Sequence, residues 1–373
     1  MNSVQTSAAE KTQRSRKRRS GQQTDLVPGI LLAAPAILLL LMFLIGPFFA
    51  GIGFSFTNIR LISANPTEWV GLRNYQRLTK IAVLSVEPVV DPATGQPMVD
   101  ENGDYVFPRS RDFTRDEESY PQYAGTREWF TVDTGTTRHF VLAGDPAFMK
   151  SLVNVIFFAL VVIPLQTSLG LLLAILVNQK LKARNFFRTI YFSPVVTSMV
   201  VISIVWVFLY DKDNGLINQF LGLFGIAAVN WLGNSSTAIW AIIIMSVWQG
   251  VGFQMVLFLA GLQGIPDYLY EAASIDGANI LQKFRYVTIP GLRSIFVFII
   301  ITITIAAFQL FTQVFVMTNG GPNDATTTVV FHMVRKGFRE QDIAVAAAIG
   351  VLFFLFILAI SMVQRFVLRD KEA

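Results

Sequence analysis

The chain has 373 residues, of which 53% are hydrophobic and only 15% are charged, and its formal net charge is +5. Soluble domains usually carry about 25% charged residues, so this composition argues against a soluble protein. The basic residues lie beside long apolar segments, which fits the flanks of membrane helices better than a nucleic-acid-binding surface. The absence of cysteine excludes disulfides and thiolate chemistry, and the two distant histidines, His139 and His332, argue against a histidine-rich metal centre.

The N-terminal segment, residues 1–25, is a basic arm that contains Lys11, Arg14, Arg16, Lys17, Arg18 and Arg19. A basic run before an apolar segment also begins secretory signal peptides. The apolar stretch that follows, 26–57, is too long for a signal core, and no cleavage pattern of small residues stands out at its end. We therefore expect a retained first membrane helix over 26–57.

Residues 58–149 form the one large polar stretch between apolar segments. Its Gly, Pro, Asn and Asp residues, concentrated for example at 91–97 and 100–104, indicate short strands and turns. We expect a small irregular or β-type extracytoplasmic insert between the first and second membrane helices. Its expected core consists of Val99, Tyr105, Val106, Phe107, Trp129 and Phe130.

The remainder, 150–366, contains five further uncharged apolar segments, at 151–177, 189–210, 238–264, 295–317 and 343–363. Each is long enough to cross a bilayer at 1.5 Å per residue. The predicted fold class is an all-α membrane protein with six transmembrane helices, followed by a short tail at 367–373.

The connections between these segments differ in charge. Basic residues mark the loop after the second helix, the connection at 265–294 and the tail, namely Lys180, Lys182, Arg184, Arg188, Lys283, Arg285, Arg293, Arg365, Arg369 and Lys371. With six helices, these segments and the basic arm lie on one side. The positive-inside rule predicts that this side, with both termini, is cytoplasmic. We expect a multi-pass membrane protein, and the family resemblance described below implies the bacterial cytoplasmic membrane.

The predicted spans contain no Asp, Glu, Lys, Arg or His, which argues against a proton-driven or ion-driven carrier. They contain neutral amides and aromatic rings instead. Amides can hydrogen-bond hydroxyl groups and rings can cover C–H faces, so we expect a path for a sugar or polyol lined by Gln249, Gln254, Phe308, Gln309 and Gln313. The same amides could instead join helices through interhelical hydrogen bonds, and the sequence leaves both interpretations open.

No catalytic constellation is visible. A phosphate-binding loop ends in Gly-Lys-Ser/Thr, and the sequence has no Gly-Lys dipeptide. No set of nucleophile, base and orienting group stands out either. We therefore expect a protein that is not an enzyme, with no catalytic residue, no metal and no cofactor of its own.

The most specific segment lies between the fourth and fifth predicted helices. Pro266 suits the first turn of a short helix, and Gly277 is placed to end that helix with a positive φ. Asn279 and Gln282 form the capping-box pattern of a second short helix, which Pro290 is expected to stop. An ordinary amphipathic surface helix is the structural alternative.

Glu271-Ala272-Ala273, followed by Gly277 and then by Val287 and Ile289-Pro290, resembles the EAA loop of the permeases of binding-protein-dependent ATP-binding-cassette importers. The family pattern is Glu-Ala-Ala, three residues, Gly, nine residues and Ile-x-Leu-Pro, so Val and Ile here replace Ile and Leu. The resemblance implies that this loop is a coupling helix that docks in a cleft of the ATPase subunit. The residues that carry this role are then Glu271, Ala272, Ala273, Asp276, Gly277, Ala278, Ile289 and Pro290.

Two further motifs, at 213–218 and 318–322, resemble the carbohydrate-uptake branch that includes maltose and glycerol-3-phosphate permeases, although both also fit simple turns. This resemblance implies the MetI-like permease fold and import of a sugar or related polyol. It also implies a second homologous permease subunit, two ATPase subunits that bind ATP and Mg, and an extracytoplasmic solute-binding protein. The competing classes are a stand-alone carrier or channel, and a receptor or scaffold that uses the insert as its binding domain.

Overall fold

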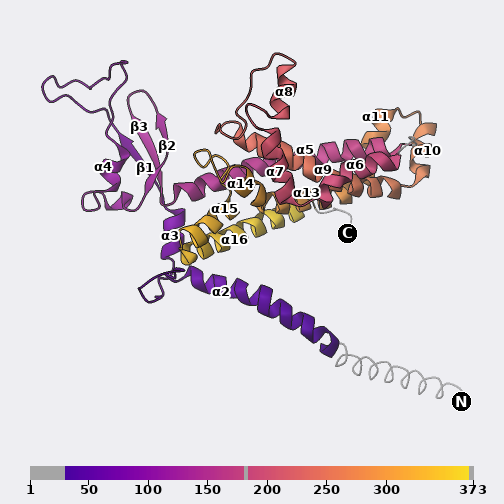
Figure 1. Cartoon of the computed structure of the whole chain (residues 1–373), viewed down its shortest axis with the longest axis horizontal. Helices are drawn as coiled ribbons and strands as arrows, with labels where there is room; N and C mark the ends of the chain where they lie inside the picture. The colour runs from indigo at the N-terminus through magenta and orange to yellow at the C-terminus, as the bar shows by residue number, and fades with distance from the viewer. Residues whose placement is uncertain (1–29, 180–183, 369–373) are drawn as a thin grey trace, which may run out of the picture.

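The structure is a computed structural model that describes residues 30–179 and 184–368. The predicted basic arm at 1–25, the basic residues Lys180 and Lys182, and the end of the tail beyond 368 lie outside the described residues. The described chain is mostly helical, with one small sheet, and it is elongated (Figure 1).

Four of its helices are long and apolar enough to cross a membrane. The first runs over Ile30–Ser55 and includes η1 (Leu41–Ile45) and α2 (Gly46–Ser55). The others are α5 (Pro146–Asn178), α9 (Ala238–Gly264) and α16 (Ile343–Leu368). The predicted segments 151–177, 238–264 and 343–363 fall within these last three helices.

The third and fifth predicted spans are not continuous helices. The segment 189–210 is divided between α6 (Arg184–Val196) and α7 (Met199–Leu209), which meet at 101°. Pro194 lies inside α6, and Ser198 takes an extended ψ of 130°, so the helix cannot run through this point. The segment 295–317 is divided between α13 (Arg293–Phe308) and α14 (Thr312–Met317). The described chain has four spans, or up to six if two bent pairs of helices each count as one span: α6 with α7, and the helix over 280–291 with α13, which meet at 66°.

The bundle is built around the contact between α5 and α9, on which α6 and α13 also pack. Small residues allow this close approach, because a Cβ atom on Gly170 would lie 2.7 Å from Cβ of Gln254. A polar contact adds to it, since Nε2 of Gln166 donates to the Ser246 carbonyl at 2.8 Å. The interior is apolar, and Ile242, Met255 and Phe258 are fully buried at its centre.

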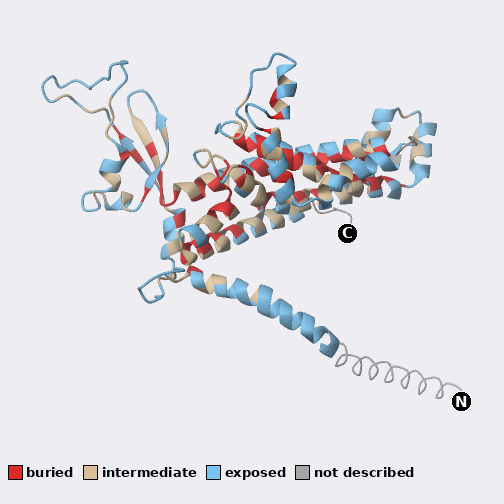
Figure 2. Ribbon diagram, viewed as in Figure 1, coloured by how far each residue is buried: buried red, intermediate tan, exposed pale blue. Residues whose placement is uncertain are grey.

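The helix that ends in α2 diverges from the bundle and is exposed around most of its surface (Figure 2). It approaches α16 near its end, where the rings of Phe48 and Phe354 make an edge contact at 5.2 Å. A helix that is apolar on every face and not covered by protein is stable only where its surroundings are also apolar. Hydrocarbon of the bilayer provides such surroundings for the span 30–55.

The insert folds around a three-stranded antiparallel sheet in the order β1-β3-β2, formed by β1 (Ile81–Val86), β2 (Arg127–Asp133) and β3 (Arg138–Ala143). Short helices surround it: α3 (Arg73–Thr79), α4 (Ser110–Thr114) and η2 (Pro121–Tyr123). The β-type character predicted from the sequence is confirmed. The predicted core is largely wrong, because the buried cluster consists of Leu84, Val86, Phe140 and Leu142, with Phe107 packed at its edge and Val99, Tyr105 and Phe130 exposed.

The remaining elements lie in the connections. They are α8 (Leu216–Gly222), α10 (Asp267–Ile275), α11 (Ile280–Lys283), η3 (Phe284–Thr288), α12 (Ile289–Gly291), α15 (Val329–Val334) and η4 (Arg335–Arg339). Figure 1 shows α10 and α11 at the end of the bundle opposite the sheet of the insert. The two most distinctive non-membrane parts of the chain are thus separated by the length of the bundle.

Candidate functional site

The segment between α9 and α13 consists of short helices, and the glycine and capping-box signals predicted from the sequence are both present. Helix α10 begins directly after Pro266, which is its N-cap residue, and ends before Gly277, whose φ is +76°. The amide of Ala278 donates to the carbonyl of Ala273 at 2.9 Å and closes the turn. Glycine reaches this left-handed conformation without the steric cost that a Cβ atom imposes.

The capping box of the second short helix is also present. The amide of Gln282 donates to Oδ1 of Asn279 at 2.9 Å, and the amide of Asn279 donates to Oε1 of Gln282 at 2.7 Å. The expected stop at Pro290 is wrong, because η3 and α12 continue through Pro290 to Gly291. The five-residue π-turn of η3 precedes this proline, and the helix bends by 66° only afterwards, at the junction with α13.

Helix α10 projects from the bundle and buries none of its residues. Three large apolar side chains of α10 and the following turn are exposed: Tyr268 is 65% exposed, Ile275 is 87% exposed and Ile280 is 88% exposed. Glu271 and Ala272 are exposed on the same helix, whereas Ala273 and Ala278 are half-buried. Large apolar side chains that are exposed together on a projecting helix and its following turn are typical of a contact surface for another protein.

Side-chain contacts join the projecting helix to the elements that follow it in the chain. The hydroxyl groups of Tyr270 and Thr288 lie 3.0 Å apart, and Nζ of Lys283 donates to Oγ of Ser274 at 2.7 Å. Ile265 is buried against Gly291, where an added Cβ would lie 2.8 Å from its Cδ1 atom. These contacts connect α10 to α11 and η3, and they connect the residue before Pro266 to α12.

The five residues predicted to line a substrate path lie in different surroundings. Gln254 is buried between α5 and α9, and its Oε1 atom has no hydrogen-bond partner among the described residues. Gln249 is half-buried and makes only a long 3.5 Å contact with the Pro194 carbonyl. Gln309 is exposed, and half-buried Gln313 lies across the break between α13 and α14. Phe308 is buried against the rings of Phe353 and Phe356, as a packing residue is.

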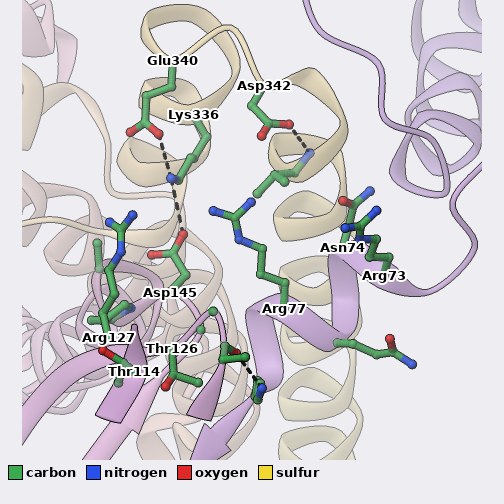
Figure 3. Close-up of a pocket in the computed structure, with 18 of the residues that line it drawn as sticks. Arg73, Asn74, Arg77, Thr114, Thr126, Arg127, Asp145, Lys336, Glu340 and Asp342 are labelled. Atoms are coloured by element: carbon green, nitrogen blue, oxygen red, sulfur yellow. Dashed lines mark hydrogen bonds and ion pairs between the residues drawn. The ribbon is translucent and has the colours of Figure 1, made fainter. Parts of the chain in front are cut away.

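A network of charged groups at the opposite end of the bundle was not predicted from the sequence. Asp145 caps α5 by accepting from the amide of Phe148 at 3.0 Å. Its Oδ2 atom lies 3.2 Å from Nε2 of His332. The same atom lies 3.6 Å from Nζ of Lys336, a contact that Figure 3 shows. Arg335 extends the network to His332 and Asp324. The only signal in the sequence is the Asp145-Pro146 start of a helix, because the partner His332 lies 187 residues further along the chain.

Opposing influences act on the pKa of Asp145. Burial alone raises the pKa of this carboxyl group, but the hydrogen bond from His332, the charge of Lys336 and the amide of Phe148 together bring its pKa well below the ordinary range. Burial also raises the pKa of Asp324, and the hydrogen bonds from Arg335 and Thr327 outweigh this effect and lower it. Both groups are carboxylates that hold the insert end of the bundle together.

The sequence matches the model of a known protein family. The model of binding-protein-dependent transport system inner membrane components matches residues 166–372, more than half of the chain. The chain belongs to this family of membrane proteins. The match covers the broken helices, α10 and the segment up to the end of α16, and it does not include the insert.

Individual relatives agree with this assignment. The chain is 36% identical over 244 residues to the probable ABC transporter permease protein YurN of Bacillus subtilis, which covers 64% of this chain and 83% of the relative. It is 34% identical to the arabinooligosaccharides transport system permease protein AraP of Halalkalibacterium halodurans, over 59% of this chain and 71% of the relative. It is 36% identical to the trehalose/maltose transport system permease protein MalF of Thermococcus litoralis, over 55% and 70%.

Solved structures share the fold. A chain of a bacterial ABC transporter that imports the acidic polysaccharide alginate superimposes with a TM-score of 0.64 at 17% sequence identity, over 96% of this chain and 100% of that chain. The same fold in a complex of the alginate transporter with an oligosaccharide-bound periplasmic protein gives a TM-score of 0.56. At this level of identity the likeness establishes the fold, which extends over the insert as well as the bundle.

Proposed function

We propose that this chain is the membrane-spanning permease subunit of an ATP-binding-cassette importer that moves a sugar or related polyol across the cytoplasmic membrane. Membership of the transport family and relatives named for oligosaccharide and disaccharide transport support this proposal. The observation that carries it is the projecting α10, which is closed by a left-handed glycine and exposes its apolar side chains.

The proposed assembly has further members. A second homologous permease completes the path, two ATPase subunits bind ATP and Mg, and an extracytoplasmic binding protein delivers the solute. The chain itself performs no catalysis in this scheme and holds no cofactor. Both of its termini and α10 face the cytoplasm, whereas the insert faces outward.

The proposed mechanism uses the connections of α10 to the bundle. Residues from Glu271 to Ala278, with Ile289 and Pro290, form the docking element on the ATPase. When the ATPase subunits close, they displace α10, and the contact of Tyr270 with Thr288 carries the displacement into α12 and α13. Since α9 and α13 both pack on α5, movement of the pair changes access to the interior of the bundle.

A pair of substitutions at Gly277 tests this proposal. Space around the site is open, so Gly277→Val acts through backbone strain at φ +76° and not through a clash. Left-handed backbone costs an L-residue about 1–2 kcal/mol, whereas Asn tolerates it well. In proteoliposomes that hold the complete complex, we expect Gly277→Val to reduce sugar uptake per ATP hydrolysed at least several-fold and Gly277→Asn to retain most of it.

Two results would contradict the proposal. One is full coupling in the Gly277→Val variant despite normal membrane insertion. The other is sugar uptake by vesicles that contain this chain alone, which is the behaviour of a stand-alone carrier. A chain that co-purifies with no ATPase at all fits the receptor or scaffold class instead.

A further inference from the structure

A cleft of about 1790 Å³ separates the insert from the adjacent end of the bundle (Figure 3). Of the nine Lys and Arg residues in 58–149, all but Arg109 and Arg138 line this cleft. Of the thirteen acidic residues in the same segment, only Glu117, Glu128 and Asp145 line it. The insert is acidic overall, yet it concentrates its positive charge on this one face.

The acidic side chains on the bundle wall of the cleft already have partners. Asp324 accepts from Arg335 at 2.8 Å, Glu340 lies 2.7 Å from Lys336, and Asp342 lies 4.0 Å from Arg60. On the insert wall, by contrast, most of the basic side chains have no such partner among the described residues. Five arginines there make no side-chain hydrogen bond or ion pair with any part of the chain that the structure describes: Arg73, Arg77, Arg111, Arg115 and Arg127.

The spacing of these arginines increases their mutual repulsion. Arg73 and Arg77 lie four residues apart on α3, and Arg111 and Arg115 lie four residues apart along α4 and its C-cap. Like charges at this spacing face each other across one turn and destabilise a helix. In Figure 3, Arg77 and Arg127 extend into the cleft from opposite elements of the insert. An anionic ligand in the cleft would relieve this repulsion.

We propose that the cleft binds an acidic oligosaccharide through its carboxylate groups, an inference that rests on the sugar-import function proposed above. The guanidinium group is a planar fork that binds carboxylates through two parallel hydrogen bonds. Five such groups on α3, α4 and β2 fit an extended ligand with several carboxylates better than a single small anion. Trp129, half-buried on β2 and lining the same cleft, offers a ring for the C–H face of a sugar.

Equilibrium binding to the purified complex in nanodiscs, without ATP or binding protein, tests this inference. The probes are a short oligouronate, a neutral malto-oligosaccharide of equal length, and inorganic phosphate. We expect the oligouronate to bind at least about tenfold more tightly than either other probe, with an affinity that falls as salt rises. The double variant Arg77→Gln/Arg127→Gln should lose at least about tenfold of this affinity. Lys212→Gln, which removes a positive charge from an exposed loop outside the cleft, should leave it unchanged.

Three results would overturn the inference: no binding of the oligouronate, equal affinity in the double variant, or phosphate binding as strong as that of the oligouronate. The last result would assign the arginines to a simple anion or a lipid phosphate. Uptake assays separate this inference from the proposed function. If the complex imports sugars but the cleft fails to bind the oligouronate, only the inference is wrong, whereas cleft binding without any ATP-dependent uptake contradicts the proposed function.

Discussion

The hydrogen bonds around His332 determine which ring nitrogen carries its hydrogen. Nη2 of Arg335 lies 3.1 Å from Nδ1 of the histidine, and a guanidinium group can only donate. Nδ1 is therefore the acceptor, and Nε2 carries the hydrogen that it donates to Asp145 at 3.2 Å. The imidazole thus accepts a hydrogen bond from Arg335 on η4 and donates one to Asp145, the N-cap residue of α5. This chain joins two segments that are distant in the sequence.

Removal of the charge of Asp145 tests the contribution of this network to stability. The side chain is buried and has three partners, and Asp145→Asn removes its negative charge and leaves one acceptor oxygen for the three donors. Hydrogen bonds to a charged group contribute about 1.5–3 kcal/mol each. We expect a loss of at least about 2 kcal/mol, measured as a lower midpoint of thermal unfolding in detergent. Glu340→Gln, which alters an exposed partner of Lys336, should cost less than about 1 kcal/mol.

The difference in stability between the wild type and Asp145→Asn should depend on pH. The pKa of Asp145 is lowered in the folded state. Its contribution to the free energy of unfolding is therefore complete above the ordinary carboxyl pKa of about 4 and is lost as the pH falls below that value. The unfolding midpoints of the wild type and Asp145→Asn should therefore differ at neutral pH and converge in acid. A difference that stays constant from neutral pH into this acidic range would mean that the carboxylate contributes nothing through its charge.

At the scale of elements, hydropathy located the apolar helices but not the breaks within the third and fifth predicted spans. The predicted segment 238–264 coincides with α9, and 151–177 misses only the first turn of α5, because Lys150 interrupts the uncharged run. The breaks after Val196 and Phe308 lie within apolar sequence. They were not predicted, because the hydrophobicity of a segment does not indicate its backbone dihedral angles. The signals of the α10 turn are local, and they were read correctly from Gly277 and Asn279. The insert core and the Asp145 network depend on long-range pairing, which a single sequence does not reveal.

The polar residues of the bundle divide into two groups. Gln166 and Gln364 join elements, since they donate to the Ser246 carbonyl and to Oγ1 of Thr304 at 2.8 Å. The side chains of Gln309 and Gln313 make no hydrogen bond to any described residue, and they lie on either side of the α13 to α14 break. Amides at a helix break without protein partners remain available to hydroxyl groups of a solute. This favours the substrate-path interpretation for Gln309 and Gln313 over the packing interpretation.

Alanine substitution distinguishes the two interpretations. We expect Gln309→Ala/Gln313→Ala to raise the sugar concentration needed for half-maximal uptake at least several-fold, because solute hydrogen bonds are lost while packing is not. The unfolding midpoint should stay within the range expected of surface substitutions. Gln263→Ala, at an exposed position near the end of α9, is the matched control and should change neither quantity. Unaltered uptake in the double variant would remove these residues from the path.

At the scale of the whole molecule, the insert and α10 lie at opposite ends of a bundle whose helices are long enough to cross a membrane (Figure 1). The exposed surfaces at the two ends differ in chemistry. The α10 end exposes Tyr268, Ile275 and Ile280, the surface proposed to contact the ATPase, and the insert end exposes arginines that have no partner among the described residues. An importer that is driven from one side and receives its solute on the other needs two such different ends.

Sidedness can be measured directly because the chain has no cysteine, so that a single introduced thiol is a clean reporter. Ile280→Cys places it beside α10 at a position that is 88% exposed, and Thr136→Cys places it in the exposed turn between β2 and β3. In intact spheroplasts a membrane-impermeant maleimide should label Thr136→Cys and not Ile280→Cys, and permeabilised cells should show both. Labelling of Ile280→Cys in intact cells would place α10 outside. An external α10 could not contact a cytoplasmic ATPase, so this outcome would remove the physical basis of coupling whatever the family resemblance.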